Sequence, residues 1–472
     1  NKIKFMENII KNFPLIIILC LSFLTRFLFL GYPPEVVFDE VYFGKFVNSY
    51  FSHQYYFDIH PPLGKLIIFF FAKIIGYQGN LSFNVIGESS DSFYLFFLRL
   101  MPVIFGIILP FVIYFILKEI GLSKKACFLG SFLVIFENSL LVQSKFILVD
   151  IFLLVFGFLS ILFYLKYKKS KGKKSFIFLI LTYLFATFAF SIKWTGLLFI
   201  GVIFLLHFFE LLNNFNKKEI KSFLFKISLF LFIFLIIYYA IFLIHFSLLY
   251  KSGDGDNYMS LFFQKTLLEN KVSENVKPLS NWQKFIELNN KMYFYNASIK
   301  KNHINGSKWF QWPFGIEPIW YWTKTDNIGQ QSANIYLFGN FLIYWIIIIS
   351  IIYSFFCFLK KEKREKMPDF LWVCLIGWVS NLFPYLFIKR VAFLYHYFPS
   401  LLFGILIVSI LYDRIYFKLK EKGYRKIENF IYFGFLFSVF SVFLILTPLT
   451  YGFFIPSKFT PFYNFLVNFL SF

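Results

Sequence analysis

Long apolar segments alternate with polar connections along the whole chain. Apolar runs of about 20 residues are typical of helices that cross a membrane. The pattern predicts eleven such helices, at about 13–30, 94–117, 126–143, 146–165, 175–190, 194–212, 223–248, 336–358, 370–388, 394–412 and 430–450. We therefore predict an all-α polytopic membrane protein with two long loops. Its predicted parts are a seven-span module over residues 1–248 that includes the first loop (31–93), the second loop (249–335), and a four-span module (336–472).

Basic residues in the connections predict an orientation. Lysines and arginines fill the N-terminus and every second connection, whereas the alternating connections hold few of them. Cytoplasmic connections carry this excess in membrane proteins, so we expect the N-terminus inside, and the C-terminus and both long loops outside. The first apolar run has no small-residue cleavage site, and we expect it to stay as the first span.

Composition supports this reading and excludes others. The chain of 472 residues is 58% hydrophobic and 15% charged, with mean hydropathy +0.66. The net charge of +22 lies in short clusters between apolar runs, which fits membrane topology and argues against a nucleic-acid partner. Four cysteines lie in or beside apolar runs without a Cys-x-x-Cys pair, so neither a disulfide framework nor a zinc site is indicated.

The first long loop carries the strongest candidates for chemistry. Asp39 and Glu40 are adjacent, and His60-Pro61-Pro62 and Lys65 follow about twenty residues later. A carboxylate at a partly dry surface can accept a proton from a hydroxyl, while the alternative is a solvated pair or a helix cap. His60 could bind phosphate, orient a carboxylate or cap a helix. Lys65 could pair with a phosphate or reach toward water. It belongs to a short apolar segment over residues 63–76, which we expect to be a helix lying in the interface or a re-entrant piece.

Cations recur at other predicted outer turns. Ionisable groups in lipid cost roughly 2.5–3.5 kcal/mol each, so each needs a reason. Arg99 suits bidentate phosphate binding, and Lys193, Arg390 and His396 could join it at an anionic head group. The alternatives are interfacial anchors or structural ion pairs. Asp150 also needs a partner, for which Lys145 is the candidate.

The order of these motifs resembles the protein O-mannosyltransferases, integral membrane glycosyltransferases that use polyprenyl-phosphate sugars. The resemblance covers nearly the whole chain. It rests on Phe38-Asp-Glu-Val-Tyr-Phe-Gly-Lys45, Asp58-Ile-His-Pro-Pro-Leu-Gly-Lys65, Leu98-Arg99-Leu, Gln143-Ser-Lys-Phe-Ile-Leu-Val-Asp150, Ser191-Ile-Lys-Trp-Thr-Gly196, Trp309-x-x-Trp-Pro313, Ile335-Tyr-Leu-Phe-Gly-Asn340 and Phe393-Leu-Tyr-His-Tyr-Phe-Pro399. Lys145 stands where many members have arginine, and the second loop is too short for the lectin-like domain of eukaryotic members, which favours a bacterial-type enzyme.

The resemblance implies an inverting transfer of mannose from a polyprenyl phosphate to Ser or Thr hydroxyls of exported proteins, at the extracytoplasmic side of the plasma membrane. It implies Asp39 as the catalytic base, with Glu40 beside it, and Arg99 as a ligand of the lipid phosphate. We expect no cofactor besides this donor, and no metal is demanded, although Glu40 and Asp58 could hold one. The alternatives are a related transferase acting on an envelope lipid or glycan, and a transporter, which the gathering of charges at one face disfavours.

Overall fold

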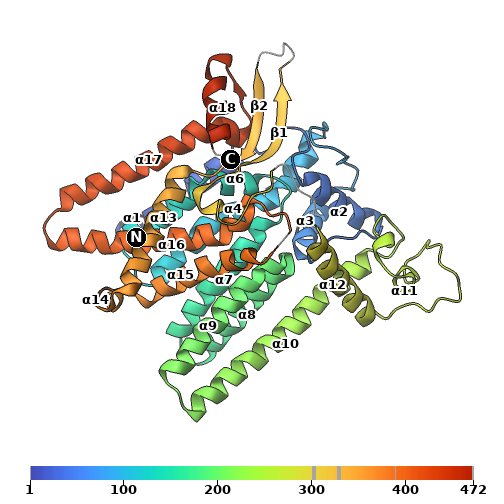
Figure 1. The fold of residues 1–472 in the computed structure, drawn as a ribbon, viewed down its shortest axis with the longest axis horizontal. Helices are drawn as coiled ribbons and strands as arrows, with labels where there is room; N and C mark the ends of the chain where they lie inside the picture. Colours follow the sequence, from blue (N-terminus) through green and yellow to red (C-terminus); the bar gives the residue numbers. More distant parts are fainter. Residues whose placement is uncertain (1, 300–304, 327–330, 389, 470–472) are drawn as a thin grey trace.

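The computed structural model describes residues 2–299, 305–326, 331–388 and 390–469. Most of the chain forms long helices that run side by side (Figure 1). Within the described residues, nine are long and apolar enough to cross a membrane. They are α4 (Ser92–Glu119), α7 (Asp150–Lys169), α8 (Gly172–Ile192), α9 (Leu197–Asn213), α10 (Lys217–Leu248), α13 (Phe341–Leu359), α15 (Asp369–Leu382), α16 (Phe398–Glu421) and α17 (Arg425–Tyr451), with short 3-10 turns that extend α9, α15 and α16.

The two remaining predicted spans also fall on helices, but each differs from the prediction. Helix α1 (Lys2–Phe27) has an apolar part of only Asn12–Phe27. The predicted span 126–143 is broken into α5 (Lys124–Ile135) and α6 (Asn138–Lys145), with a bend of 59°. Glu137 lies at the break, where its carboxylate accepts hydrogen bonds from the backbone N–H groups of Leu140 (2.6 Å) and Asn340 (2.9 Å). The count of spans and their orientation therefore stay predictions.

The first long loop folds into two short helices, α2 (Glu40–Ser52) and α3 (Leu63–Ile74). The predicted short helix over 63–76 is confirmed as a helix, whereas α2 had no counterpart in the prediction. The prolines at 61 and 62 suit the start of α3, because the first helical turn has no use for their missing N–H groups. His60, which lines the cavity described below, lies just before the start of α3.

The second long loop contains α11 (Leu261–Gln264) and α12 (Asn281–Ser298), followed by strands β1 (Ile319–Thr325) and β2 (Ser332–Leu337). Strand β3 (Phe454–Ile455) completes an antiparallel sheet in the order β1-β2-β3. The β1–β2 hairpin projects from the helices beside the last helix, α18 (Thr460–Phe469) (Figure 1). The expectation of an all-α chain thus missed a small sheet, although the helical class stands. A four-residue helix, α14 (Lys361–Arg364), lies between α13 and α15.

Helix α16 is the most deeply buried of the nine, and residues from most of the other helices join one continuous apolar core with it. Its start lies at the same end of the molecule as the ends of α8 and α15, because His396 just before α16, Lys193 just after α8 and Asn381 in the last turn of α15 line one cavity. That end carries the candidate site. The division into three modules remains a prediction.

Candidate active site

The two adjacent acids of the first long loop point to different surroundings. Glu40 is fully buried at the start of α2. Its carboxylate accepts hydrogen bonds from Arg99 Nε (2.8 Å) and Nη2 (2.7 Å), and from the backbone N–H groups of Val37 (2.9 Å) and Ile147 (3.0 Å). Both of its oxygens are therefore occupied by the protein. In this position Glu40 holds the loop in place, a geometry that does not support its prediction as a catalytic residue.

Arg99 is equally enclosed. Besides Glu40, its guanidinium donates to the backbone carbonyls of Pro33 and Glu35 at 2.8 Å each, and it lies 4.9 Å from the ring centre of Phe146. The side chain has no exposed surface. A buried charge is tolerated when a partner and further hydrogen bonds satisfy it, and this pair meets that condition. Arg99 therefore anchors the loop on α4, and its prediction as a phosphate ligand is not supported by this geometry.

Asp39, one residue earlier, remains open. Within the described residues its half-buried carboxylate accepts no hydrogen bond: Asp39 is the N-cap residue of α2, but its side chain makes no capping hydrogen bond. Burial raises the pKa of Asp39 to about 7, while Lys193 acts to lower it and Asp150 and Asp58 act to raise it. A carboxylate with a pKa near neutrality suits general-base work, because it can hold and release a proton at working pH.

Asp150 and Lys193 form the ion pair that borders Asp39. Lys193 Nζ lies 2.7 Å from Asp150 Oδ1, and Gln143 donates to the other oxygen at 2.8 Å. Tyr321 on β1 donates in turn to Gln143 at 2.5 Å. The predicted Asp150–Lys145 pair is wrong. Lys145 instead donates to the carbonyls at positions 28 (2.8 Å) and 29 (3.2 Å) and lies over the ring of Tyr451.

The His-Pro-Pro turn is held by Lys65, which is almost fully buried. Its ammonium group bonds the Asp58 carboxylate and donates to the carbonyl of His60 at 2.9 Å. Lys65 therefore stabilises the turn and does not line the large cavity, contrary to its prediction as a phosphate ligand. His60 does line that cavity. Burial, followed by the nearby Lys193 and Lys65 charges, holds the pKa of His60 well below its usual value, so its imidazole is neutral and can donate or accept one hydrogen bond.

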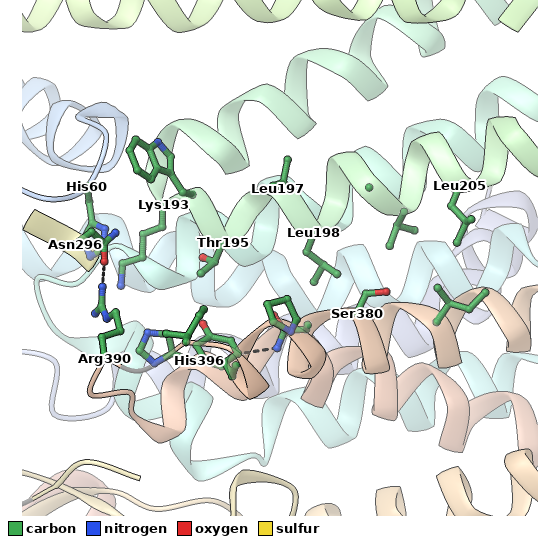
Figure 2. A pocket seen from close by; sticks show the side chains of 18 residues that line it. His60, Lys193, Thr195, Leu197, Leu198, Leu205, Asn296, Ser380, Arg390 and His396 are labelled. Atoms are coloured by element: carbon green, nitrogen blue, oxygen red, sulfur yellow. Dashed lines mark hydrogen bonds between the residues drawn. The ribbon is translucent and has the colours of Figure 1, made fainter. Parts of the chain in front are cut away.

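A cavity of about 560 Å³ has His60 and Lys193 at one end. Its polar end gathers four of the predicted residues, His60, Lys193, Arg390 and His396, together with Asn296 from α12. Arg390 donates to the Asn296 side chain, and Figure 2 shows this contact next to His60. Residue 389, which the sequence places in the same basic turn, lies outside the described residues.

The rest of the cavity is mainly apolar, although the hydroxyl residues Thr195 and Ser380 also line it. It extends away from the polar end between α9 and α15, past Leu197, Leu198 and Leu205 on one side (Figure 2) and Ile376 on the other. Asn381 helps to hold His396 in place at the polar end, because its side-chain amide donates a hydrogen bond to the backbone carbonyl of His396 at 2.9 Å. A cationic end that continues into an apolar channel can take a ligand with an anionic head and a hydrocarbon tail.

Sequence reasoning missed Asn296 and misassigned Asp150. The signal for Asn296 is a capping box at Ser280 and Gln283, which marks the start of α12 and so predicts a helix within a loop otherwise read as merely polar. Which end of that helix reaches the cavity depends on tertiary packing. Across the described residues, no three His, Cys, Asp or Glu side chains cluster in a way that could hold a metal ion, and all four cysteines are free.

Comparison with known proteins places these features in a family. Residues 16–250 match the family described as dolichyl-phosphate-mannose-protein mannosyltransferase, and residues 281–464 match the C-terminal four TMM region of protein-O-mannosyltransferase. The chain is 31% identical over 338 residues to protein O-mannosyltransferase 1 of Drosophila melanogaster, covering 69% of this chain and 37% of the relative. It is 34% identical over 280 residues to dolichyl-phosphate-mannose–protein mannosyltransferase 4 of Candida albicans, covering 56% of this chain and 37% of that protein. The chain thus matches well under half the length of these relatives.

Solved structures share the fold. The S. cerevisiae protein O-mannosyltransferase Pmt1-Pmt2 complex bound to the sugar donor superposes with a TM-score of 0.85 at 20% identity, over 93% of this chain and 90% of that chain. ArnT from Cupriavidus metallidurans gives a TM-score of 0.56 at 13% identity, over 93% and 76% of the two chains.

Proposed function

The chain is an integral membrane protein of the protein O-mannosyltransferase family, and from this we propose that it transfers mannose from a polyprenyl phosphate to Ser or Thr hydroxyls of a protein acceptor. One arrangement carries the proposal: the Asp39 carboxylate, which accepts no hydrogen bond within the described residues, is near enough to Lys193 for that charge to act on its pKa, and Lys193 lines a cavity whose cationic end continues into an apolar channel. The relatives are named for the donor dolichyl-phosphate-mannose and for protein acceptors.

The donor phosphate would lie at the polar end of the cavity. Arg390 supplies a guanidinium with a fixed fork of donors, and Lys193 supplies a second positive charge. These charges would stabilise the negative charge that grows on the phosphate as it leaves. The polyprenyl chain would follow Leu197, Leu198 and Leu205 between α9 and α15.

Asp39 would take the proton from the acceptor hydroxyl as the oxygen attacks the anomeric carbon. The sugar–phosphate bond breaks as the new bond forms, so one direct displacement inverts the anomeric centre. Phosphate leaves as a stable anion, so this step needs no strong general acid. We propose further that this site faces the extracytoplasmic side of the plasma membrane, because the connections at the opposite end of the helices are the basic ones.

The proposal is tested with purified protein in lipid nanodiscs, labelled polyprenyl-phosphate-mannose and a Ser/Thr-rich peptide. We expect the peptide to gain one hexose, attached with inverted anomeric configuration, while a matched peptide with Ala at every Ser and Thr gains none. Label that passes into a lipid or glycan fraction, with the Ser/Thr peptide unchanged, would identify a transferase with a different acceptor and overturn the proposal.

A further inference from the structure

A second large crevice lies at the far ends of the helices that form the cavity. It has a volume of about 960 Å³ and is bordered by α13, α16 and the connection that contains α14. The cavity meets α15 near Asn381 and precedes α16 at His396, whereas the crevice reaches Pro368 before α15 and Glu421 at the end of α16. On α16 the crevice begins at Ile410, which is 12 residues, or roughly 18 Å along the helix axis, beyond Phe398 at the start of the helix.

Four cations line this crevice: Lys363, Lys366, Arg414 and Lys418. Across the part of the chain that the structure describes, none of the four forms an ion pair with a carboxylate. Two acids also border the crevice. Asp413 is buried and accepts a hydrogen bond from the backbone N–H of residue 123 at 3.0 Å, and Glu421 lies at the rim. Four positive and two negative charges leave a formal excess of two positive charges.

The wall beside these cations is apolar and faces outward. Ile349 on α13 is 61% exposed and Ile415 on α16 is 52% exposed, and both line the crevice. Both belong to helices that qualify as membrane spans, so lipid chains would cover these side chains in a bilayer. Free phosphate would use the cations alone, whereas a phospholipid would use the cations and the apolar wall together.

We propose that this crevice binds an anionic phospholipid, with the head-group phosphate on the four cations and an acyl chain along Ile349 and Ile415. Basic pockets between membrane helices attract such head groups, and each Lys or Arg near the surface adds to the attraction. The site lies apart from the donor cavity and is independent of the transferase proposal. A lipid there would contact α13, α14 and α16 together. Helix α14 belongs to the short connection between α13 and α15, and residues 360–366 of that connection are exposed.

The test uses delipidated full-length protein, with lipid retention measured by native mass spectrometry. We expect phosphatidylglycerol to be retained at least roughly tenfold better than phosphatidylcholine, and the variant K363Q/K366Q/R414Q/K418Q to lose this preference. The matched control K171Q/K173Q/K174Q/K217Q removes the same charge from exposed positions at the same end of the helices, and we expect it to keep the preference.

Two results would overturn the proposal. Equal loss in the control variant would show that only the overall charge of this end matters. Displacement of phosphatidylglycerol by millimolar glycerol 1-phosphate would show that the cations hold an anion without using the apolar wall. If the fourfold variant does not fold, the pair K363Q/K366Q at exposed positions takes its place, with an expected loss of about threefold in retention and no change permitted in the thermal unfolding temperature.

Discussion

Two ion pairs near the candidate site have the same chemistry but different surroundings. Arg99 and Glu40 are fully buried, and backbone groups occupy the donors and acceptors that the pair itself leaves free. Lys193 and Asp150 keep 11% and 14% of their side-chain surfaces exposed, and Lys193 borders the cavity. The first pair is complete without a ligand, whereas the second lies where a ligand can reach it.

This contrast separates the two adjacent acids as well. Glu40 is a member of the fully buried Arg99–Glu40 pair (the closed pair), which holds the loop that carries Asp39. The charges of the partly exposed Lys193–Asp150 pair (the open pair) act on the pKa of Asp39. The closed pair therefore provides rigidity, and the open pair provides charge to the reacting groups. Adjacent positions in the sequence thus serve the site in different ways, because the first residue of a helix and its cap face different directions.

Replacement of Asp39 tests the open side most directly. Asp39→Asn keeps the shape of the side chain but removes its basicity, so we expect the rate of transfer to fall by about 10²–10⁴-fold. Donor affinity and the thermal unfolding temperature should change little, because the carboxylate accepts no hydrogen bond from the described residues. Asp254→Asn, at an exposed position of the second long loop, serves as the control. Transfer by Asp39→Asn at the wild-type rate would contradict the base assignment.

The two arginines should respond in opposite ways. Arg99→Met leaves the Glu40 carboxylate buried without its partner, and we expect the free energy of unfolding to fall by about 3–5 kcal/mol. Arg390→Met should instead weaken donor binding by roughly 10–100-fold, since it removes hydrogen bonds from a charged donor worth about 1.5–3 kcal/mol. Denaturation in detergent and titration with the donor measure the two effects. A stable Arg99→Met protein with lost donor affinity would restore Arg99 as the phosphate ligand.

Much of the helical fold can be read from the sequence, because the length and hydropathy of a membrane helix are local properties. All eleven predicted segments fall on helices or on the bent pair α5–α6. The bend itself could not be predicted, since Glu137 is satisfied by the backbone of residue 340, which is distant in the chain. The pairing of β3 was missed for the same reason, because β3 consists of only two residues and pairs with a strand more than a hundred positions earlier. The β1–β2 hairpin is local in sequence, and the prediction did not recognise it.

The candidate site was predictable in its residue types but not in its pairings. The sequence identified Asp39 and four of the groups at the polar end of the cavity, because charges are rare at the edges of apolar runs. It also gave Arg99 and Lys65 the role of phosphate ligands. Whether a cation meets a carboxylate or a cavity depends on packing between segments tens of residues apart, and a single sequence does not carry that information.

The pH dependence of transfer tests the contrast between Glu40, which is paired with Arg99, and Asp39, which accepts no hydrogen bond from the described residues. The base must be deprotonated, and burial raises the pKa of Asp39 to about 7. The rate should therefore rise with pH and level off above about 7, and at pH 6 only roughly one tenth of the carboxylates would be ionised. Single-turnover transfer between pH 5.5 and 8, with donor binding measured at each pH, checks this. Removal of the positive charge in Lys193→Gln should move the midpoint to higher pH, because Lys193 acts to lower the pKa of Asp39. A rate that is flat over this range would argue against Asp39 as the base.

The smallest expected effect concerns the apolar channel, which is the part of the cavity that leads away from its polar end. Gly201 on α9 lines the cavity, and a Cβ at this position would meet no atom within 4 Å. Gly201→Leu should therefore fill part of the channel without a clash inside the protein. We expect it to weaken binding of a long polyprenyl donor about fivefold, corresponding to ~1 kcal/mol of overpacking against the lipid chain, and to spare a donor with a chain of two isoprene units. Gly434→Leu on α17, where a Cβ also meets open space, is the matched control. Equal weakening of the long and short donors would mean that the substitution disturbs the polar end, and the channel would then lose its assignment to the lipid tail.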